Sequence, residues 1–168
     1  MASTYVNDLR LEEITTGEQA GTWGDTTNRN LELIAEAFGY GTETISDSTP
    51  TSITIADGVS DAARSFYLKI QGALSQNTVV SLLPNTVSKV WIIQNATTDS
   101  GSSGPYSIEI KQGTGATVVI PNGTTKMIAT DGGTTGAIVY DLFASLSINP
   151  IISTALLPDA AGGADLGT

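Results

Sequence analysis

The sequence predicts a mainly β protein, in which an extended N-terminal arm and one short helix precede an antiparallel β-sandwich or jelly-roll-like domain. Of the 168 residues, 24 are threonine and 18 are glycine, while only 14% are charged. This balance suits strands whose surface is wetted by hydroxyl groups rather than by ions. Apolar residues follow a period of two from about Thr51 onward. Turn residues separate these runs at short intervals, which is typical of an all-β domain.

Residues 1–24 are the predicted arm, because their few apolar residues keep neither a helical nor a strand period. The arm opens the acidic part of the chain. Up to Asp61 there are 11 acidic residues and 2 basic ones, a net charge of −9, whereas the remainder carries −1. A nucleic-acid partner is excluded, since phosphate binding needs a basic stripe. The acidity serves either solubility alone or electrostatic docking to a basic partner.

Residues 25–38 are the predicted helix. Its apolar side chains recur at i, i+3, i+4 and i+7 and share one face: Leu31, Ile34, Ala35 and Phe38. Asp25 suits the first turn and Gly39 provides the stop. An isolated helix below roughly 12–15 residues is marginal in water, so this one needs a surface to lie on. Either the stripe and Trp23 cap the core of this chain, or they dock on a partner or on copies of themselves.

A linker over residues 39–50 leads into the predicted β domain, residues 51–146. Candidate strands cover residues 52–56, 65–71, 77–83, 88–95, 106–111, 116–121, 125–130 and 137–144. Asn122 and Gly123 stand between two apolar runs, the strongest short hairpin signal. We therefore expect a meander over residues 106–144.

The strand at residues 88–95 is apolar on both faces around Trp91. It is either a central strand covered on both sides, the alternative that we favour, or a strand whose outer face meets another subunit. The exposure of Trp91 decides between them. Residues 147–168 place apolar residues between turn residues and are expected to be a linker that looks cut off within a motif.

Composition argues against catalysis and against cofactors. The chain has no histidine and no cysteine, which removes the commonest general base, the usual zinc ligands and any disulfide. The acidic loops at Asp99 and Asp131 lack a complete calcium ligand set and are expected to be turns. No leader and no membrane-spanning run is apparent, so we expect a soluble chain made in a reducing cytoplasm, without membrane insertion.

Several stretches resemble a known family. Residues 1–5 (MASTY), 16–24 (TGEQAGTWG) and 27–31 (TNRNL) resemble the N-terminal region of tail fibre proteins from tailed bacteriophages, notably those of marine and cyanobacterial hosts. Residues 110–118 (IKQGTGATV) and 120–123 (IPNG) are similar to the domain that follows in such proteins, and residues 157–167 (LPDAAGGADLG) resemble the entry to a fibre shaft.

The resemblance implies a virion structural protein of the phage tail, made in the host cytoplasm, and typically a parallel homotrimer. Its N-terminal part would anchor to another tail protein, such as an adaptor, nozzle or baseplate protein, while distal parts contact a host receptor. No catalytic residue comes with the resemblance. The 168 residues depart from the family pattern in length, since they include no shaft and no recognisable receptor-binding tip. We expect either the anchor of a longer fibre or a short protein to which host recognition is not assigned.

On this hypothesis the arm and the helix form a docking element that faces equivalent helices or the tail surface. The interface candidates are Trp23, Asn30, Leu31, Ile34, Phe38 and Trp91. Two other functions stay open. A trimeric β domain with an arm also suits a capsid decoration, head-fibre or cement protein, and a carbohydrate-binding module would use exposed aromatic residues, with Tyr67, Trp91 and Tyr140 as candidates.

Overall fold

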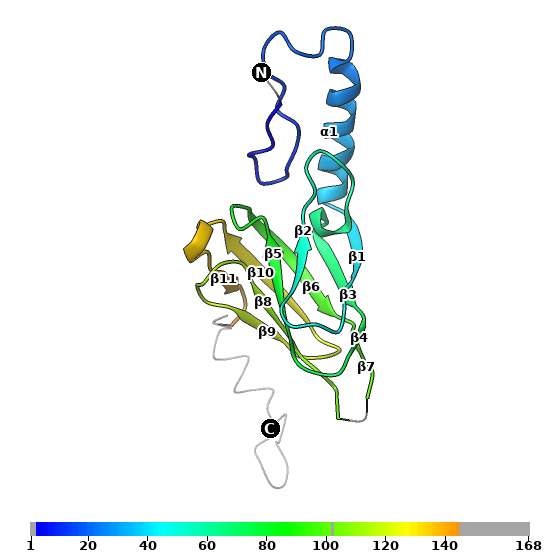
Figure 1. Cartoon of the computed structure of the whole chain (residues 1–168), viewed down its shortest axis with the longest axis vertical. Coiled ribbons are helices and arrows are strands. Elements are labelled where there is room, and N and C mark those ends of the chain that lie inside the picture. Colours follow the sequence, from blue (N-terminus) through cyan, green and yellow to red (C-terminus); the bar gives the residue numbers. More distant parts are fainter. Residues whose placement is uncertain (1–2, 102, 145–168) are drawn as a thin grey trace, which may run out of the picture.

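The computed structural model describes residues 3–101 and 103–144 and has one α-helix and eleven strands (Figure 1). Helix α1 spans Trp23–Ala37, and two short 3-10 helices follow later, η1 (Ala62–Arg64) and η2 (Thr134–Gly136). The strands are β1 (Tyr40–Thr44), β2 (Thr51–Thr54), β3 (Tyr67–Gln71), β4 (Ala73–Leu74), β5 (Thr78–Leu83), β6 (Ser88–Asn95), β7 (Thr98–Asp99), β8 (Ile108–Lys111), β9 (Val118–Ile120), β10 (Thr125–Asp131) and β11 (Val139–Asp141). The chain is thus mainly β with a single α-helix, as the sequence predicts.

The strands form mixed sheets. The five-stranded sheet has the order β1-β3-β6-β10-β11, the four-stranded sheet has the order β2-β5-β8-β9, and β4 pairs with β7. Strands β1, β3 and β6 run parallel to one another, as do β2, β5 and β8, and as do β4 and β7. Up to β8, the strands of the two larger sheets alternate along the chain, and each new strand pairs in parallel with the previous strand of the same sheet. The first two thirds of the domain therefore wind as a coil.

The last part of the domain closes this coil with antiparallel strands. β9 pairs antiparallel with β8 in one sheet, whereas β10 pairs antiparallel with β6 and β11 in the other. The expected all-antiparallel pairing is therefore wrong, and so is the expected meander. At Asn122 and Gly123 the chain passes from one sheet to the other instead of turning back as a hairpin, with Gly123 at φ +74° and its N–H bonded to the Asn95 carbonyl.

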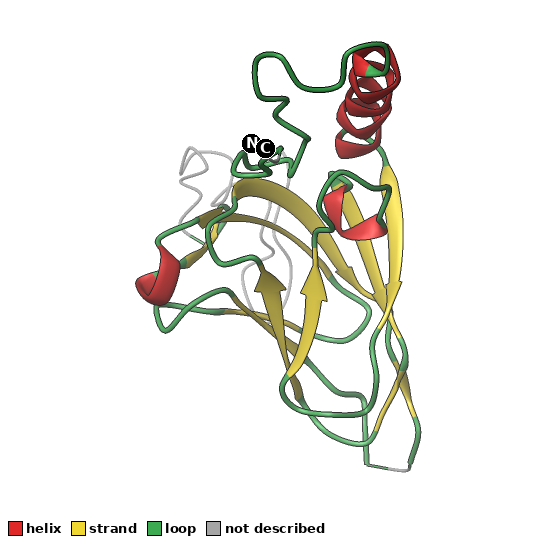
Figure 2. Ribbon diagram, turned by 45° about the horizontal axis from the view of Figure 1, so that its top comes forward, coloured by secondary structure: helices red, strands yellow, loops and turns green. Residues whose placement is uncertain are grey.

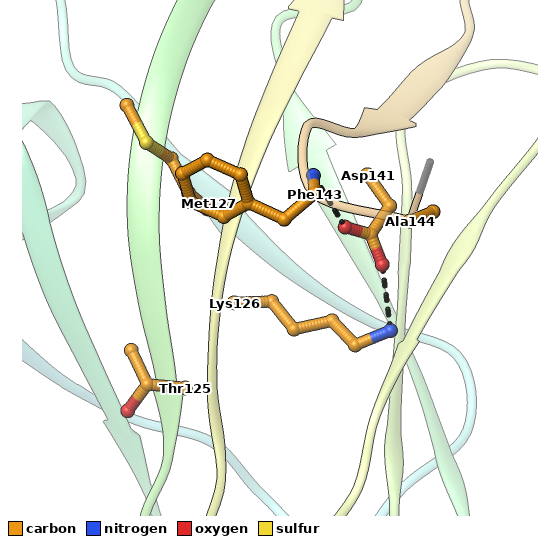
Figure 3. Close-up of a pocket in the computed structure, with 6 residues that line it drawn as sticks. All are labelled: Thr125, Lys126, Met127, Asp141, Phe143 and Ala144. Carbon is orange, nitrogen blue, oxygen red and sulfur yellow. Dashed lines mark hydrogen bonds and ion pairs between the residues drawn. The ribbon is translucent and has the colours of Figure 1, made fainter. Parts of the chain in front are cut away.

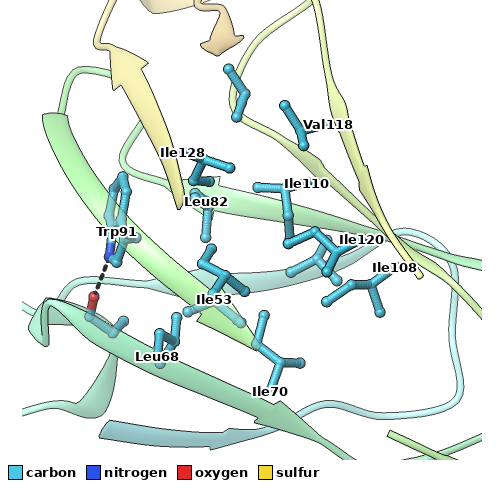
Figure 4. Close-up of a cluster of buried hydrophobic side chains, with 14 of the residues drawn as sticks. Ile53, Leu68, Ile70, Leu82, Trp91, Ile108, Ile110, Val118, Ile120 and Ile128 are labelled. Atoms are coloured by element: carbon cyan, nitrogen blue, oxygen red, sulfur yellow. Dashed lines mark hydrogen bonds between the residues drawn. The ribbon is translucent and has the colours of Figure 1, made fainter. Parts of the chain in front are cut away.

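Buried side chains of both sheets meet in one hydrophobic cluster (Figure 4). Alternate residues of each strand point inward, as in Ile108 and Ile110 of β8 or Leu68 and Ile70 of β3, all of which are fully buried. Each of the eight predicted runs contains a strand, so the period of two located these strands correctly.

The predicted linker at residues 39–50 is wrong in its first half, because β1 lies there and pairs with β3. The strand was hidden by its inward residue, which is Gly41 rather than an apolar side chain. A Cβ at Gly41 would collide with the Ala62 carbonyl of η1, so only glycine fits under η1. The predicted segment 147–168 lies outside the described residues.

Candidate docking surface

Helix α1 comes directly before β1 in the chain and lies beyond the end of the sheets (Figure 1). It starts at Trp23, two residues before the predicted start. Its buried residues are Thr26, Leu33 and Ala37. The stripe predicted from the sequence lies on another side of the helix, so α1 turns a mainly small and polar face toward its own chain.

The predicted stripe is largely in water. Trp23 is 63% exposed, Leu31 59% and Phe38 80%, while Ile34 is half-buried at the border of this face. Trp23 and the stripe therefore do not cap the core of the described chain. Thr27, Leu31, Ile34 and Phe38 follow one another at spacings of four, three and four residues, the pattern of a coiled-coil seam. We call Trp23, Leu31, Ile34 and Phe38 the helix stripe.

The N-terminal arm folds back on itself and lies beside α1 rather than extending away (Figure 2). Thr4 and Glu13 pair as an antiparallel bridge. The Asn30 side chain on α1 holds the arm, since its Oδ1 accepts from the Glu12 N–H at 3.1 Å and its Nδ2 donates to the Glu12 carbonyl at 2.9 Å. The predicted extended conformation is wrong. Asn30, which is predicted to be an interface residue, binds the arm within the chain through both of its side-chain polar groups and is half-buried.

Arg64 joins the arm, the helix and the β domain. Its side chain is fully buried, and its Nε donates to the Leu9 carbonyl of the arm at 2.9 Å. One Nη1 bond, also of 2.9 Å, goes to Glu36 Oε1 on α1. Further bonds from the guanidinium reach the carbonyls of Val59 and Ala56. The guanidinium thus fixes the helix and the arm to the domain that carries them.

The carboxylates around Arg64 show where part of the acidic charge goes. Glu36 accepts from Arg64 and from the Asp61 N–H, and Asp61 lies 3.4 Å from Arg64 Nη2. Burial raises the pKa of Asp61, against the lowering effect of the Ala56 N–H and Arg64. Ion pairs at the surface engage further acids, as at Arg10–Asp57. Several acidic side chains of residues 1–61 therefore hold the arm and loops together. This role differs from both alternatives given above for the acidic residues, solubility and docking to a basic partner.

Trp91 lies inside the domain and is 1% exposed, and its Nε1 donates to the Ala63 carbonyl at 3.0 Å (Figure 4). Its assignment to an interface is therefore corrected. β6 is a central strand, because it lies in the middle of the five-stranded sheet, but the favoured alternative of cover on both sides is met only on its inner face. Val90 and Ile92, on the outer face of the same strand, are only half-buried.

The other sites considered from the sequence resolve into local structure. Asp99 accepts from the N–H groups of Gly101 and Gly104, and Asp131 from those of Gly133 and Ile138, so both side chains cap their own turns. These backbone donors hold the pKa of Asp131 below its usual range. No group of three or more potential metal ligands occurs in residues 3–101 and 103–144.

The aromatic candidates for sugar binding do not form a platform. Trp91 is buried, Tyr67 stacks on Tyr40 with ring centroids 5.4 Å apart, and Tyr140 stands on β11, at the opposite edge of the sheet from β1. The three candidates therefore do not meet at one point, because Trp91 is buried and the two tyrosines stand on different strands of the sheet.

A shallow pocket of about 300 Å³ lies between β10 and the end of β11 (Figure 3). Lys126 Nζ and Asp141 Oδ2 form an ion pair of 2.7 Å there, and this contact lowers the pKa of Asp141. Met127 and Phe143 supply apolar lining. Because the two charged groups neutralise each other, the pocket presents neither a nucleophile nor a free acid–base pair.

Comparison with family models, with curated proteins and with solved structures gives no match to this chain. Within the part of the chain that the structure describes, no helix is both long and apolar enough to cross a bilayer. We therefore infer the function from the exposure of the helix stripe and from the contacts of Arg64 and Asn30 that hold α1 and the arm in place.

Two features of this surface could not be read from the sequence. Periodicity located the helix stripe but not the side on which α1 is buried. The role of Arg64 was missed altogether, because a single arginine beside two alanines gives no periodic signal. The only hint was Asp61 three residues before it, in a segment where bases are rare.

Proposed function

We propose that this chain is the N-terminal module of a phage tail fibre, a virion structural protein that anchors the fibre to the tail. In this proposal the two sheets pack as a β-sandwich, three copies associate in parallel, and distal parts of the fibre contact the host receptor. The helix stripe docks on an adaptor, nozzle or baseplate protein. No catalysis is proposed.

One observation carries the proposal: a helix fixed rigidly to a β domain leaves Trp23, Leu31 and Phe38 largely in water. An exposed tryptophan and phenylalanine on one helix face are typical anchors of a protein–protein interface. An apolar helix face of this kind fits a groove on a partner. Because Arg64 and Asn30 hold α1 and the arm in place, docking requires little ordering of the chain, which favours affinity.

The proposal is tested by immunogold labelling of intact phage particles, with antibody raised to residues 51–144 and read by electron microscopy. Gold confined to the tail is the expected result. Gold spread over the head would overturn the tail assignment in favour of capsid decoration, and particles without gold would overturn both structural roles.

A further inference from the structure

The outer face of the five-stranded sheet carries a row of apolar side chains that crosses four of its strands and ends just after the fifth. Register places Tyr40 beside Tyr67, Tyr67 beside Ile92, and Ile92 beside Met127. The Leu142 N–H, just after β11, donates to the Met127 carbonyl and extends the row. All five point outward, because the residues between them on the strands, such as Leu68, Trp91 and Ile128, point into the core.

A second, shorter row lies next to the first. Val90 pairs with Ala129, which pairs with Tyr140 on β11. We call these two rows the outer band. Tyr40 is 61% exposed, Tyr140 47% and Leu142 40%. Among the described residues, no helix or strand packs across the band, since α1 stands beyond the end of the sheet (Figure 2).

The outer face of the four-stranded sheet is different. Its outward residues include one row in which Ser81 lies between Ser52 and Lys111, and another in which Glu109 lies between Val79 and Val119. Polar and charged groups thus interrupt every apolar run on that face, as on an ordinary solvent-facing sheet. The contrast between two faces of one domain indicates that the apolar character of the outer band is not a general feature of its surface.

Charge and size indicate what covers the band. Neither row contains an ionised side chain, although residues 1–61 carry a net charge of −9. A basic partner would therefore find no complement on the band, whereas two copies of a neutral face meet without repulsion. Tyr40 and Tyr140 alone leave on the order of 200 Å² of side-chain surface in water. The other residues of the band add less, because five of them are half-buried. The band would therefore form the apolar centre of an interface to which each partner contributes roughly 800 Å².

We propose that the outer band is the surface on which one copy of this chain packs against a second copy. The helix stripe then stays available for a different partner at the end of the domain. The inference deepens the proposed function, because it names the surface that joins the copies of the proposed trimer, but it does not depend on placement in a phage tail.

Sedimentation velocity of the purified chain tests the proposal. We expect the unmodified protein to be a homo-oligomer at micromolar concentration. Ile92→Lys, which places a charge in the middle of the band, should weaken association by at least a hundredfold. Val119→Lys is the matched control, since it adds the same charge at a residue 48% exposed on the other sheet, and it should sediment as the unmodified protein does.

A second variant covers the case in which Ile92→Lys fails to fold, as judged by the loss of its cooperative thermal melt. Tyr140→Lys alters a half-exposed residue of an edge strand and should dissociate the oligomer while the fold persists. A monomeric unmodified protein, or band variants that stay oligomeric, would overturn the proposal. Sedimentation uses the purified chain without phage particles. Its result therefore tests the outer band alone, and the immunogold experiment tests the placement in a phage tail separately.

Discussion

Arg64 is the residue that connects most parts of the molecule. Replacing it by methionine removes the donors of the Leu9, Val59 and Ala56 carbonyls and leaves Glu36 without its cation. Breaking a buried ion pair on one side costs about 3–5 kcal/mol, so we expect a loss of that size in the free energy of unfolding. Urea denaturation measures it.

Arg10 provides the control for Arg64. Arg10→Met breaks an ion pair with Asp57, whose side chain is half-exposed, and should cost about 1 kcal/mol or less. Equal losses in the two variants would contradict the special role of the buried guanidinium.

Lys89 predicts a pH dependence. Burial, and to a lesser degree the charge of Arg64, lower the pKa of Lys89 from 10.5 to about 8. Its Nζ donates to the Ser65 carbonyl and lies 4.8 Å from the ring centroid of Trp91. Between these pKa values the unfolded chain binds the proton that the folded chain has released, so this residue makes the protein more stable as the pH rises from about 8 to 10.5.

Comparison of the unmodified protein with Lys89→Met isolates the effect of this lysine. From pH 8 to 10.5 the free energy of unfolding of the unmodified protein should gain on the order of 1–3 kcal/mol relative to the variant. Thermal or urea unfolding at several pH values measures the difference. Two parallel pH profiles would show that the folded and unfolded states bind this proton equally.

Residue-level prediction from the sequence succeeded where a period carried the information. The apolar residues on both faces of the strand around Trp91 correctly indicated a central strand, but not that Val90 and Ile92 would remain half-buried while Trp91 was fully buried. Asn30 and Arg64 act through single hydrogen-bonding groups that meet distant segments. Such contacts leave no trace in local sequence, because their partners are selected by the tertiary fold.

At the level of elements, Asn95 joins the end of β6 to segments of the other sheet. Its Nδ2 donates to the carbonyls of Ile120 and Tyr106, and its Oδ1 accepts from the Thr97 N–H and hydroxyl. The side chain is fully buried. The Asn95 side chain thus provides hydrogen-bond partners for buried backbone groups at the point where the chain leaves the five-stranded sheet, and it fixes the conformation of the chain there.

Asn95→Ala should therefore destabilise the domain by about 2–3 kcal/mol, the cost of leaving two buried carbonyls without their side-chain donor. Gln94→Ala, at the neighbouring outward position, should cost about 0.5 kcal/mol or less, as surface substitutions usually do. Chemical denaturation of both variants checks the prediction, and a similar small loss in each would show that the conformation at the end of β6 does not depend on Asn95.

The positions of eight of the eleven strands were predictable, whereas the pairing of the strands was not. Alternation identifies a half-buried strand regardless of whether its neighbour is parallel or antiparallel. Pairing is decided by connections, and the sequence signal at Asn122 and Gly123 is the same for a hairpin as for a corner between two sheets. Short strands β4 and β7 contain two residues each, too few for any period.

At the level of the whole molecule, the chain carries two separate exposed apolar surfaces, for which we propose different partners. A coil of parallel strands, closed by antiparallel ones, presents the outer band along one sheet. Helix α1 and the arm extend from the end of the same sheet and present the helix stripe. The division explains how a chain could join copies of itself through the sheet and attach to another protein through the helix.

The most direct test of this account measures Trp23→Ala in two settings. Trp23 makes up a large part of the exposed stripe, so its loss should remove the protein from purified phage particles, as quantified by immunoblot against the major capsid protein. The cooperative thermal melt of the purified variant should equal that of the unmodified protein, because Trp23 is 63% exposed. Val119→Ala, an exposed apolar residue on β9, should keep both properties. Normal incorporation of Trp23→Ala into particles, or loss of its cooperative melt, would contradict the role of the helix stripe as a docking surface.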